Sequence, residues 1–227
     1  MRTCGNHLVI VLLVSTVLGW TTAFGGRTEA GGRQAPPARP VPAPPLQAPA
    51  DSPSPGNPVV AVTTSMGDIT FELFKDRAPV SVENFVRYVS EGFYEGTVFH
   101  RVKKGFMIQG GGYTADLAEK PTRPPIQNEA TNGLRNLRGT LAMARRMSLR
   151  SATSQFYVNV VDNRMLDHTG FSPDEFGYAV FGRVLSGMDV VDRIASVPTK
   201  ADGEMEDVPV EPVVIKSVRV VKPAPVP

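Results

Sequence analysis

The chain has 227 residues, with 24 Lys and Arg against 22 Asp and Glu. Four basic and two acidic residues lie within residues 1–58, so the remaining 169 residues carry 20 charges of each sign. This neutral balance gives no reason to expect a nucleic-acid partner, because binding to a phosphate backbone needs a basic excess.

The first segment has the layout of a signal peptide. Arg2 precedes an apolar run from Leu8 to Trp20, and small residues follow it. A run of about 13 residues is shorter than the roughly 20 that a helix needs to cross a bilayer. We therefore expect residues 1–24 to be removed on export, which makes the protein periplasmic or secreted; the alternative is an uncleaved leader that tethers it to the inner membrane. The single cysteine, Cys4, lies in this segment, so no disulfide is expected in the mature protein.

Residues 25–58 differ sharply in composition from the rest of the chain. They hold ten of the 21 prolines, among Gly, Ala and Ser. Such a stretch lacks amide donors and large apolar side chains, which predicts a disordered spacer, largely in the polyproline II conformation. A docking motif for a partner is the less favoured alternative. The folded domain is expected over residues 59–227.

The pattern after Val59 predicts strands and two helices. Apolar residues alternate over 59–64 and again over 69–73, which indicates a hairpin. Pro79 then opens a helix with apolar residues at positions 82, 85, 86 and 89, and Gly92 suits its C-terminal cap. Further strands are predicted over 97–102, 106–109, 140–144, 156–160, 178–184 and 213–221, with a second helix over 187–195. Eight strands with only two helices predict a mainly β fold, an antiparallel barrel whose ends the helices cover.

Most kinds of catalytic site find no support in the sequence. His100 and His168 lack the spacing of a metal site, so structural or surface roles are favoured and we expect no metal and no cofactor. Ser154 does not lie in a Gly-x-Ser-x-Gly elbow, which leaves acyl transfer unsupported. Residues Gly110–Gly112 lead into a polar loop rather than a helix, which favours a sharp bend or a close backbone approach over a phosphate cradle.

Two groups of basic residues allow more than one interpretation. Arg145, Arg146 and Arg150 lie together between two predicted strands, where a solvated loop is favoured over recognition of an acidic substrate. The segment FHRVKKGFMIQGGG, residues 99–112, places Arg101 on the same strand face as an aromatic residue. Such an arginine is either a functional group at the mouth of the barrel or a solvated edge charge, and the residues alone favour the second.

A family resemblance changes that balance. Segment 99–112 resembles the signature of the cyclophilins, peptidyl-prolyl cis-trans isomerases, together with four further motifs in the same order: Met143–Ala144, Ser154–Tyr157, Leu166–Asp167 and Val180–Gly182. The resemblance extends from about Val59 to Val221, and residues 124–145 are closer to the exported bacterial branch. The family fold is an eight-stranded antiparallel barrel capped by two helices.

The resemblance implies an isomerase that accelerates rotation about X-Pro bonds in exported proteins during folding, with a role beside the chaperones. Two alternatives stay open: a proline-binding holdase module with incidental catalysis, and a barrel that carries a small ligand. The expected partners are proline-containing polypeptides, with no nucleic acid and no membrane unless the leader is retained. The sequence gives no strong sign of oligomerisation, and we expect a monomer.

The resemblance also implies the site residues. Arg101 is the expected catalytic donor, and Gln109 would orient it and the peptide. The pocket for the proline ring is expected to be lined by Phe106, Met107, Tyr157 and Leu166. Residues before the proline are expected to be flanked by Ala144, Arg145 and Gln155, and substrate contacts are also expected from Met165 and Tyr178.

Several of these positions depart from the commonest family pattern. Tyr157 stands where Phe is usual, and a hydroxyl there needs a partner or an opening to water. Tyr178 stands where many members have His, and Arg145 where Asn is common. Met165 takes the position of a Trp in drug-sensitive members, so we expect weak binding of cyclosporin, because Met has no indole N–H to donate.

Overall fold

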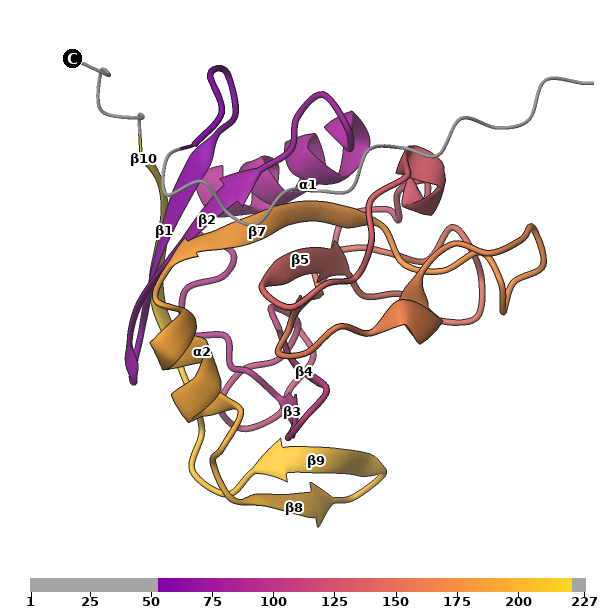
Figure 1. Cartoon of the computed structure of the whole chain (residues 1–227). Helices are drawn as coiled ribbons and strands as arrows, with labels where there is room; N and C mark the ends of the chain where they lie inside the picture. The colour runs from indigo at the N-terminus through magenta and orange to yellow at the C-terminus, as the bar shows by residue number, and fades with distance from the viewer. Residues whose placement is uncertain (1–52, 222–227) are drawn as a thin grey trace, which may run out of the picture. The chain divides into compact units, whose positions relative to one another are not determined.

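The computed structural model describes residues 53–221, whose centre is one curled antiparallel sheet (Figure 1). Its eight strands follow the order β10-β1-β2-β7-β5-β6-β4-β3, and every neighbouring pair is antiparallel. The strands are β1 (Val59–Thr64), β2 (Gly67–Leu73), β3 (Arg101–Lys103), β4 (Met107–Gly110), β5 (Thr140–Met143), β6 (Phe156–Asn159), β7 (Val180–Ser186) and β10 (Ile215–Val221). The predicted mainly β, eight-stranded antiparallel fold is confirmed.

The two edge strands of this sheet, β3 and β10, approach each other through the residues that precede them. Val98 and Val214 form an isolated bridge, and the Phe99 amide donates to the Val213 carbonyl oxygen at 3.0 Å. The expected strand over 97–102 is wrong over residues 97–100, because β3 begins at Arg101. The Val98 amide donates instead to Tyr113, on the other side of the segment, so residues 97–100 divide their hydrogen bonds between two partners and form no continuous ladder.

A second, two-stranded sheet was not predicted. Strands β8 (Thr199–Asp202) and β9 (Met205–Pro209) form a hairpin, and β9 packs beside β3 (Figure 1). Every residue of β8 is exposed, so it lacks both the alternation that predicted the first hairpin and the apolar residues that marked the later strands. The remaining local signal is Gly203, whose φ of 59° suits a tight turn.

The first helix, α1 (Pro79–Ser90), begins and ends as its sequence predicts. Proline occupies its first turn, where no amide donor is needed. At the C-terminus, Gly92 has a φ of 65° and donates to Val89, while the Phe93 amide donates to the Tyr88 carbonyl oxygen at 3.0 Å. This is a Schellman motif, and the rings of Tyr88 and Phe93 pack at 4.6 Å as its apolar contact. The second predicted helix is also present, as α2 (Met188–Ile194).

Buried aromatic rings connect α1 to the inside of the sheet. Phe156 on β6 lies at their centre, 5.4 Å from Phe85 of α1, 5.6 Å from Tyr94 and 6.2 Å from both Phe71 and Phe99. All four contacts are edge-to-face, an arrangement that ring quadrupoles favour. One face of β6 is therefore fixed in the core, and its other face is left for the site.

A buried ion pair holds the start of the described chain against the sheet. The Arg183 Nε donates to Glu72 Oε2 at 2.7 Å, and the Glu72 side chain is fully buried. The other carboxylate oxygen, Oε1, accepts from the Ser54 amide at 2.7 Å and from Asn57 Nδ2 at 2.8 Å. Burial raises the pKa of Glu72, but these hydrogen bonds outweigh it and hold the pKa below its usual value of 4.5.

The predicted leader, and the linker as far as residue 52, lie outside the described residues. Within residues 53–221, neither helix is long and apolar enough to cross a membrane.

Candidate functional site

The surface beside β3, β4 and β6 holds a cavity of about 160 Å³. It is lined by nine of the eleven predicted site residues: Arg101, Phe106, Met107, Gln109, Ala144, Arg145, Tyr157, Leu166 and Tyr178. Gln155 lines a larger cavity next to it. Met165 lines neither of these two cavities, and 78% of its surface is exposed.

The alternation of side chains along β4 and β6 separates this site from the main core. Ile108 and Val158 point inward and are fully buried in the main apolar cluster. Their neighbours Met107 and Tyr157 point to the other face, where they join a second apolar cluster beneath the cavity. Because floor residues and core residues alternate along the same two strands, the floor of the cavity is supported by the packed core.

A polar network holds the floor from below. The Tyr157 hydroxyl donates to Asn136 Oδ1 at 2.7 Å, and Asn136 Nδ2 donates to the Leu166 carbonyl oxygen at 3.0 Å. Asn163 Nδ2 donates to the Phe106 carbonyl oxygen at 2.8 Å and to Asn159 Oδ1 at 2.7 Å. Two residues of the cavity, Phe106 and Leu166, are thus tied through buried amides. The sequence predicted that the Tyr157 hydroxyl needs a hydrogen-bond partner or an opening to water. The structure gives it a partner, Asn136, which the sequence did not identify.

Arg101 lies at the edge of the cavity, at the start of β3. Gln109 is its direct neighbour in the β3–β4 register, but the Gln109 side chain donates to Gln155 Oε1 at 2.9 Å. The charged group beside Arg101 is Asp207 of β9, whose Oδ2 lies 3.6 Å from the Arg101 Nε. Sequence reasoning missed Asp207, because its strand was not predicted.

Arg145 forms a wall of the cavity. Its Nε donates to the Gly177 carbonyl oxygen at 3.0 Å, and its Nη2 donates to the Pro173 carbonyl oxygen at 2.7 Å. Its Nη1 donates to the backbone carbonyl oxygens of Arg146 and Met147. The guanidinium lies over the Tyr178 ring, 4.8 Å from the ring centroid. All three guanidinium nitrogens are therefore engaged within the protein, so Arg145 acts as a strut between two loops rather than as a free charge.

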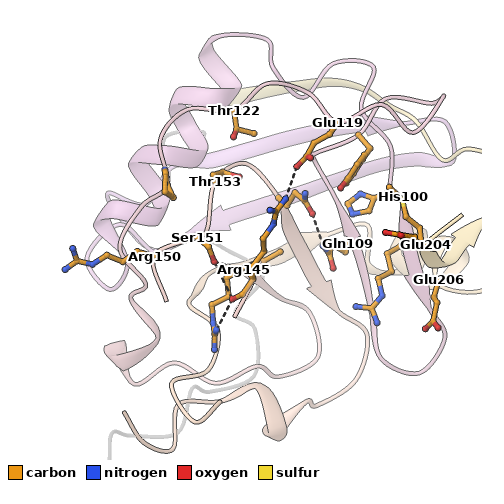
Figure 2. Close-up of a pocket in the computed structure, with 17 residues that line it drawn as sticks. His100, Gln109, Glu119, Thr122, Arg145, Arg150, Ser151, Thr153, Glu204 and Glu206 are labelled. Carbon is orange, nitrogen blue, oxygen red and sulfur yellow. Dashed lines mark hydrogen bonds and ion pairs between the residues drawn. The ribbon is translucent and has the colours of Figure 1, made fainter. Parts of the chain in front are cut away.

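A larger cavity of about 680 Å³ adjoins the first (Figure 2). The two cavities share Arg101, Gln109, Ala144 and Arg145. Glu204 and Glu206, on the β8–β9 hairpin, lie on one side of it, and Arg150 lies on the other (Figure 2). The Gln109–Gln155 hydrogen bond lies where the two cavities meet. An extended peptide can therefore reach from the small apolar slot into a wider polar groove.

Two glycines shape this junction. A Cβ at Gly112 would lie 2.5 Å from the Gln155 Cγ, and one at Gly111, where φ is 82°, would lie 2.8 Å from the Tyr94 ring. The prediction of a close backbone approach over Gly110–Gly112 is confirmed, and the approach positions Gln155.

The two histidines within residues 53–221 have structural surroundings. His100 is buried against Tyr113, with ring centroids 4.6 Å apart, and burial lowers its pKa to about 4. His168 packs against Phe171 and Phe176, and its Nδ1 lies 3.0 Å from the Phe176 carbonyl oxygen. Across residues 53–221 there is no group of three or more acidic, histidine or cysteine side chains placed to hold a metal ion.

The arrangement combines an apolar slot with one permanently charged donor. Met107 and Tyr157 are nearly fully buried beneath the slot, while 38% of the Arg101 side chain is exposed at its edge. Arginine stays protonated at all ordinary pH values, so this donor can stabilise a lone pair without transferring a proton. Ser154 is fully buried and lines neither cavity, which leaves it unsuited to attack a substrate.

Comparisons with known proteins agree with this geometry. Residues 59–220 match the family described as cyclophilin type peptidyl-prolyl cis-trans isomerase/CLD. The chain is 55% identical over 163 residues to peptidyl-prolyl cis-trans isomerase A of Dickeya dadantii, covering 72% of this chain and 84% of that one. It is 53% identical over 162 residues to peptidyl-prolyl cis-trans isomerase B of Escherichia coli, covering 71% and 99%. A crystal structure of a Cryptosporidium parvum cyclophilin type isomerase in the presence of the dipeptide ala-pro is similar with a TM-score of 0.60 and 25% identity, covering 72% of this chain and 99% of that one.

Proposed function

Because the chain belongs to the cyclophilin-type peptidyl-prolyl cis-trans isomerases, we propose that Arg101 catalyses the rotation of X-Pro bonds whose proline ring occupies the 160 Å³ cavity. The chain is a peptidyl-prolyl cis-trans isomerase, and the proposal concerns how its own residues perform the reaction. The observation that carries it is the position of Arg101 beside the apolar floor formed by Met107 and Tyr157.

The reaction needs little chemistry. An X-Pro bond rotates over a barrier of roughly 18–20 kcal/mol, because amide resonance is lost as the bond twists. In the twisted state the prolyl nitrogen becomes pyramidal and its lone pair is localised. A hydrogen-bond donor aimed at that nitrogen is therefore favoured more in the transition state than in either planar state, which lowers the barrier.

Arg101 supplies such a donor. A charge-assisted hydrogen bond is worth about 1.5–3 kcal/mol, which corresponds to roughly one to two decades of rate. Any further acceleration has to come from the slot, where Phe106, Met107 and Leu166 hold the ring while the residues before the proline rotate. An apolar slot also strengthens the hydrogen bond, because fewer water molecules compete for the guanidinium.

The glutamine pair is placed to bind the backbone of the peptide. Gln109 and Gln155 bond to each other where the slot opens into the larger cavity, and their remaining amide groups can meet the backbone of a substrate. Ala144 and the wall formed by Arg145 bound the same opening. Gln109 is therefore placed to hold the peptide, and its expected role in orienting Arg101 stays a prediction, because the bond to Gln155 uses only its Nε2 donor.

We also propose that the substrates are exported proteins that fold outside the cytoplasm. The support is the predicted signal peptide over residues 1–24 and the resemblance of residues 124–145 to the exported branch. N-terminal sequencing of the exported protein tests this and distinguishes a cleaved leader from a membrane tether. A start near residue 25 is expected, and an intact N-terminus in the cytoplasm would contradict it.

Exchange NMR on an Ala-Pro peptide tests the role of Arg101 in the full-length protein. Arg101→Ala is expected to lower the catalysed exchange rate by about one to two decades, with only a few-fold loss of peptide affinity. Arg101→Lys should recover part of the rate, because it keeps the charge but not the planar fork. The control is Arg87→Ala on α1, which replaces an exposed arginine that lines neither cavity and should leave the rate unchanged.

The same experiment separates the isomerase from a proline-binding holdase. A binding module would lose peptide affinity and exchange rate together, whereas an enzyme loses rate selectively. If Arg101→Ala retained the full exchange rate, the proposed mechanism would be refuted, whatever its effect on affinity.

A further inference from the structure

We propose that Asp207 is a positioning residue for the reaction, whose carboxylate holds the Arg101 guanidinium at the edge of the proline cavity. The inference rests on the proposed role of Arg101 and adds to it. It starts from the ion pair between Arg101 Nε and Asp207 Oδ2, which are 3.6 Å apart, with 38% and 25% of the two side chains exposed.

The backbone of β9 is bent in a way that presents Asp207 to Arg101. Met205 pairs with Asp202 and Val208 pairs with Lys200, so residues 206 and 207 together oppose a single residue of β8. This is a β-bulge, and Asp207 occupies it with a φ of 58°. Apart from glycine, only Asn and Asp adopt such a conformation readily, which explains the residue type at this position. Bulges redirect a side chain, and this one directs a carboxylate toward β3.

The contact is not an ordinary surface pair of the hairpin. The hairpin has a surface pair of its own, in which Lys200 Nζ lies 3.2 Å from Asp202 Oδ2, with about half of each side chain exposed. Asp207 Oδ2, by contrast, is buried and accepts no hydrogen bond from the residues that the structure describes. A buried carboxylate oxygen is costly unless an opposite charge lies near it, and Arg101 supplies that charge.

The point of contact matters for catalysis. Asp207 faces the Nε of Arg101, at the inner end of the guanidinium, so both Nη groups stay available to a bound peptide. Arginine loses considerable rotamer freedom when it is ordered, and a fixed anion reduces that loss before the substrate arrives. Among the described residues Gln109 has no hydrogen bond to Arg101, since its Nε2 donates to Gln155, whereas Asp207 faces the guanidinium directly.

The hairpin also contacts the substrate groove. Glu204, Met205 and Glu206 line the larger cavity, directly before Asp207 in the chain. Glu204 and Glu206 form a wall of this cavity (Figure 2). The same short hairpin carries Asp207 to Arg101. Asp207 is a positioning residue in this scheme, because it acts through Arg101 and not on the substrate.

Asp207→Asn in the full-length protein is the test, because Asn keeps the size and tolerates the bulge conformation while removing the charge. We expect the catalysed exchange rate of the Ala-Pro peptide to fall about twofold to fivefold, the effect of a partly exposed ion pair, with the peptide dissociation constant changed less than twofold. Asp202→Asn on the same hairpin is the matched control and should leave both quantities unchanged. The NMR signal of the Arg101 Nε–H group should shift or broaden in Asp207→Asn and not in Asp202→Asn.

A double-mutant cycle separates positioning from a general structural effect. In an Arg101→Ala background, Asp207→Asn should have no further effect on the exchange rate. An equal loss in both backgrounds would overturn the inference, as would an unchanged or increased rate in the single variant, since an increase would mean that Asp207 holds Arg101 away from the substrate. If Arg101→Ala left the exchange rate unchanged, the proposed function would fail. If Arg101→Ala lowered the rate but Asp207→Asn left it unchanged, only the inference about Asp207 would fail.

Discussion

The hydrogen bond between Tyr157 and Asn136 is the most informative contact under the cavity floor. Tyr157 is 4% exposed, and burial raises its pKa well above the usual value of 10, so its hydroxyl is a neutral donor at ordinary pH. It donates to Asn136 Oδ1 at 2.7 Å, and that oxygen also lies 3.3 Å from Asn159 Nδ2. Tyr157→Phe therefore removes one hydrogen bond without leaving the Asn136 oxygen unpaired. We expect it to lower the free energy of unfolding by about 1 kcal/mol.

Asn136→Ala is expected to cost far more. It leaves the Tyr157 hydroxyl buried without an acceptor and removes the donor to the Leu166 carbonyl oxygen. An unpaired buried polar group costs about 1–3 kcal/mol, and the lost side chain adds a cavity, so the total should reach about 3–5 kcal/mol. In this background Tyr157→Phe should become neutral or stabilising, because it removes a hydroxyl that has lost its acceptor.

Urea unfolding of the four proteins of this cycle measures the coupling. We expect the double variant to lose less free energy of unfolding than the two single variants lose together, by about 1–2 kcal/mol. Tyr178→Phe serves as the matched control, because its ring also lines the cavity but none of the described residues bonds to its hydroxyl. If Tyr157→Phe destabilised both backgrounds equally, the hydroxyl would not depend on Asn136 and the reasoning would be refuted.

Two further predictions concern the walls of the site. The pKa of His100 is lowered from 6.5 to about 4 in the folded chain, so the unfolded chain binds more protons between these values and stability falls as the pH falls, by about 3 kcal/mol in total. His100→Asn should flatten this part of the pH profile of urea midpoints, and an unchanged slope would assign it to other groups. Arg145→Lys should release the carbonyls of Gly177 and Pro173, which raises the KM for the peptide about threefold at constant kcat and speeds amide exchange over 169–178. Unaltered exchange in that loop would contradict the role of Arg145 as a strut.

Local order was predictable from the sequence wherever it is set by near neighbours. β1 and β2 follow from the alternation of apolar and polar residues, the other strands of the main sheet except β3 were expected close to their observed positions, and α1 follows from Pro79, the spacing of its apolar residues and the cap at Gly92. The motifs of the family resemblance placed nine of eleven expected site residues around one cavity. They also assigned Met165 to substrate contact; it is exposed and lines neither of the two cavities, and the weak cyclosporin binding expected from it stays a prediction.

Tertiary structure alone decided how the site residues are held. The β8–β9 hairpin carries no apolar alternation, so neither the strand nor the carboxylate of Asp207 could be placed near Arg101 from the sequence. Asn136 lies in a loop, and only the fold brings its amide under Tyr157. Hydrogen bonds and ion pairs between distant segments depend on where the chain returns, whereas periodicity and capping depend on residues a few positions apart. The sequence therefore determined which groups the site contains, and the return path of the chain determined which partners orient them.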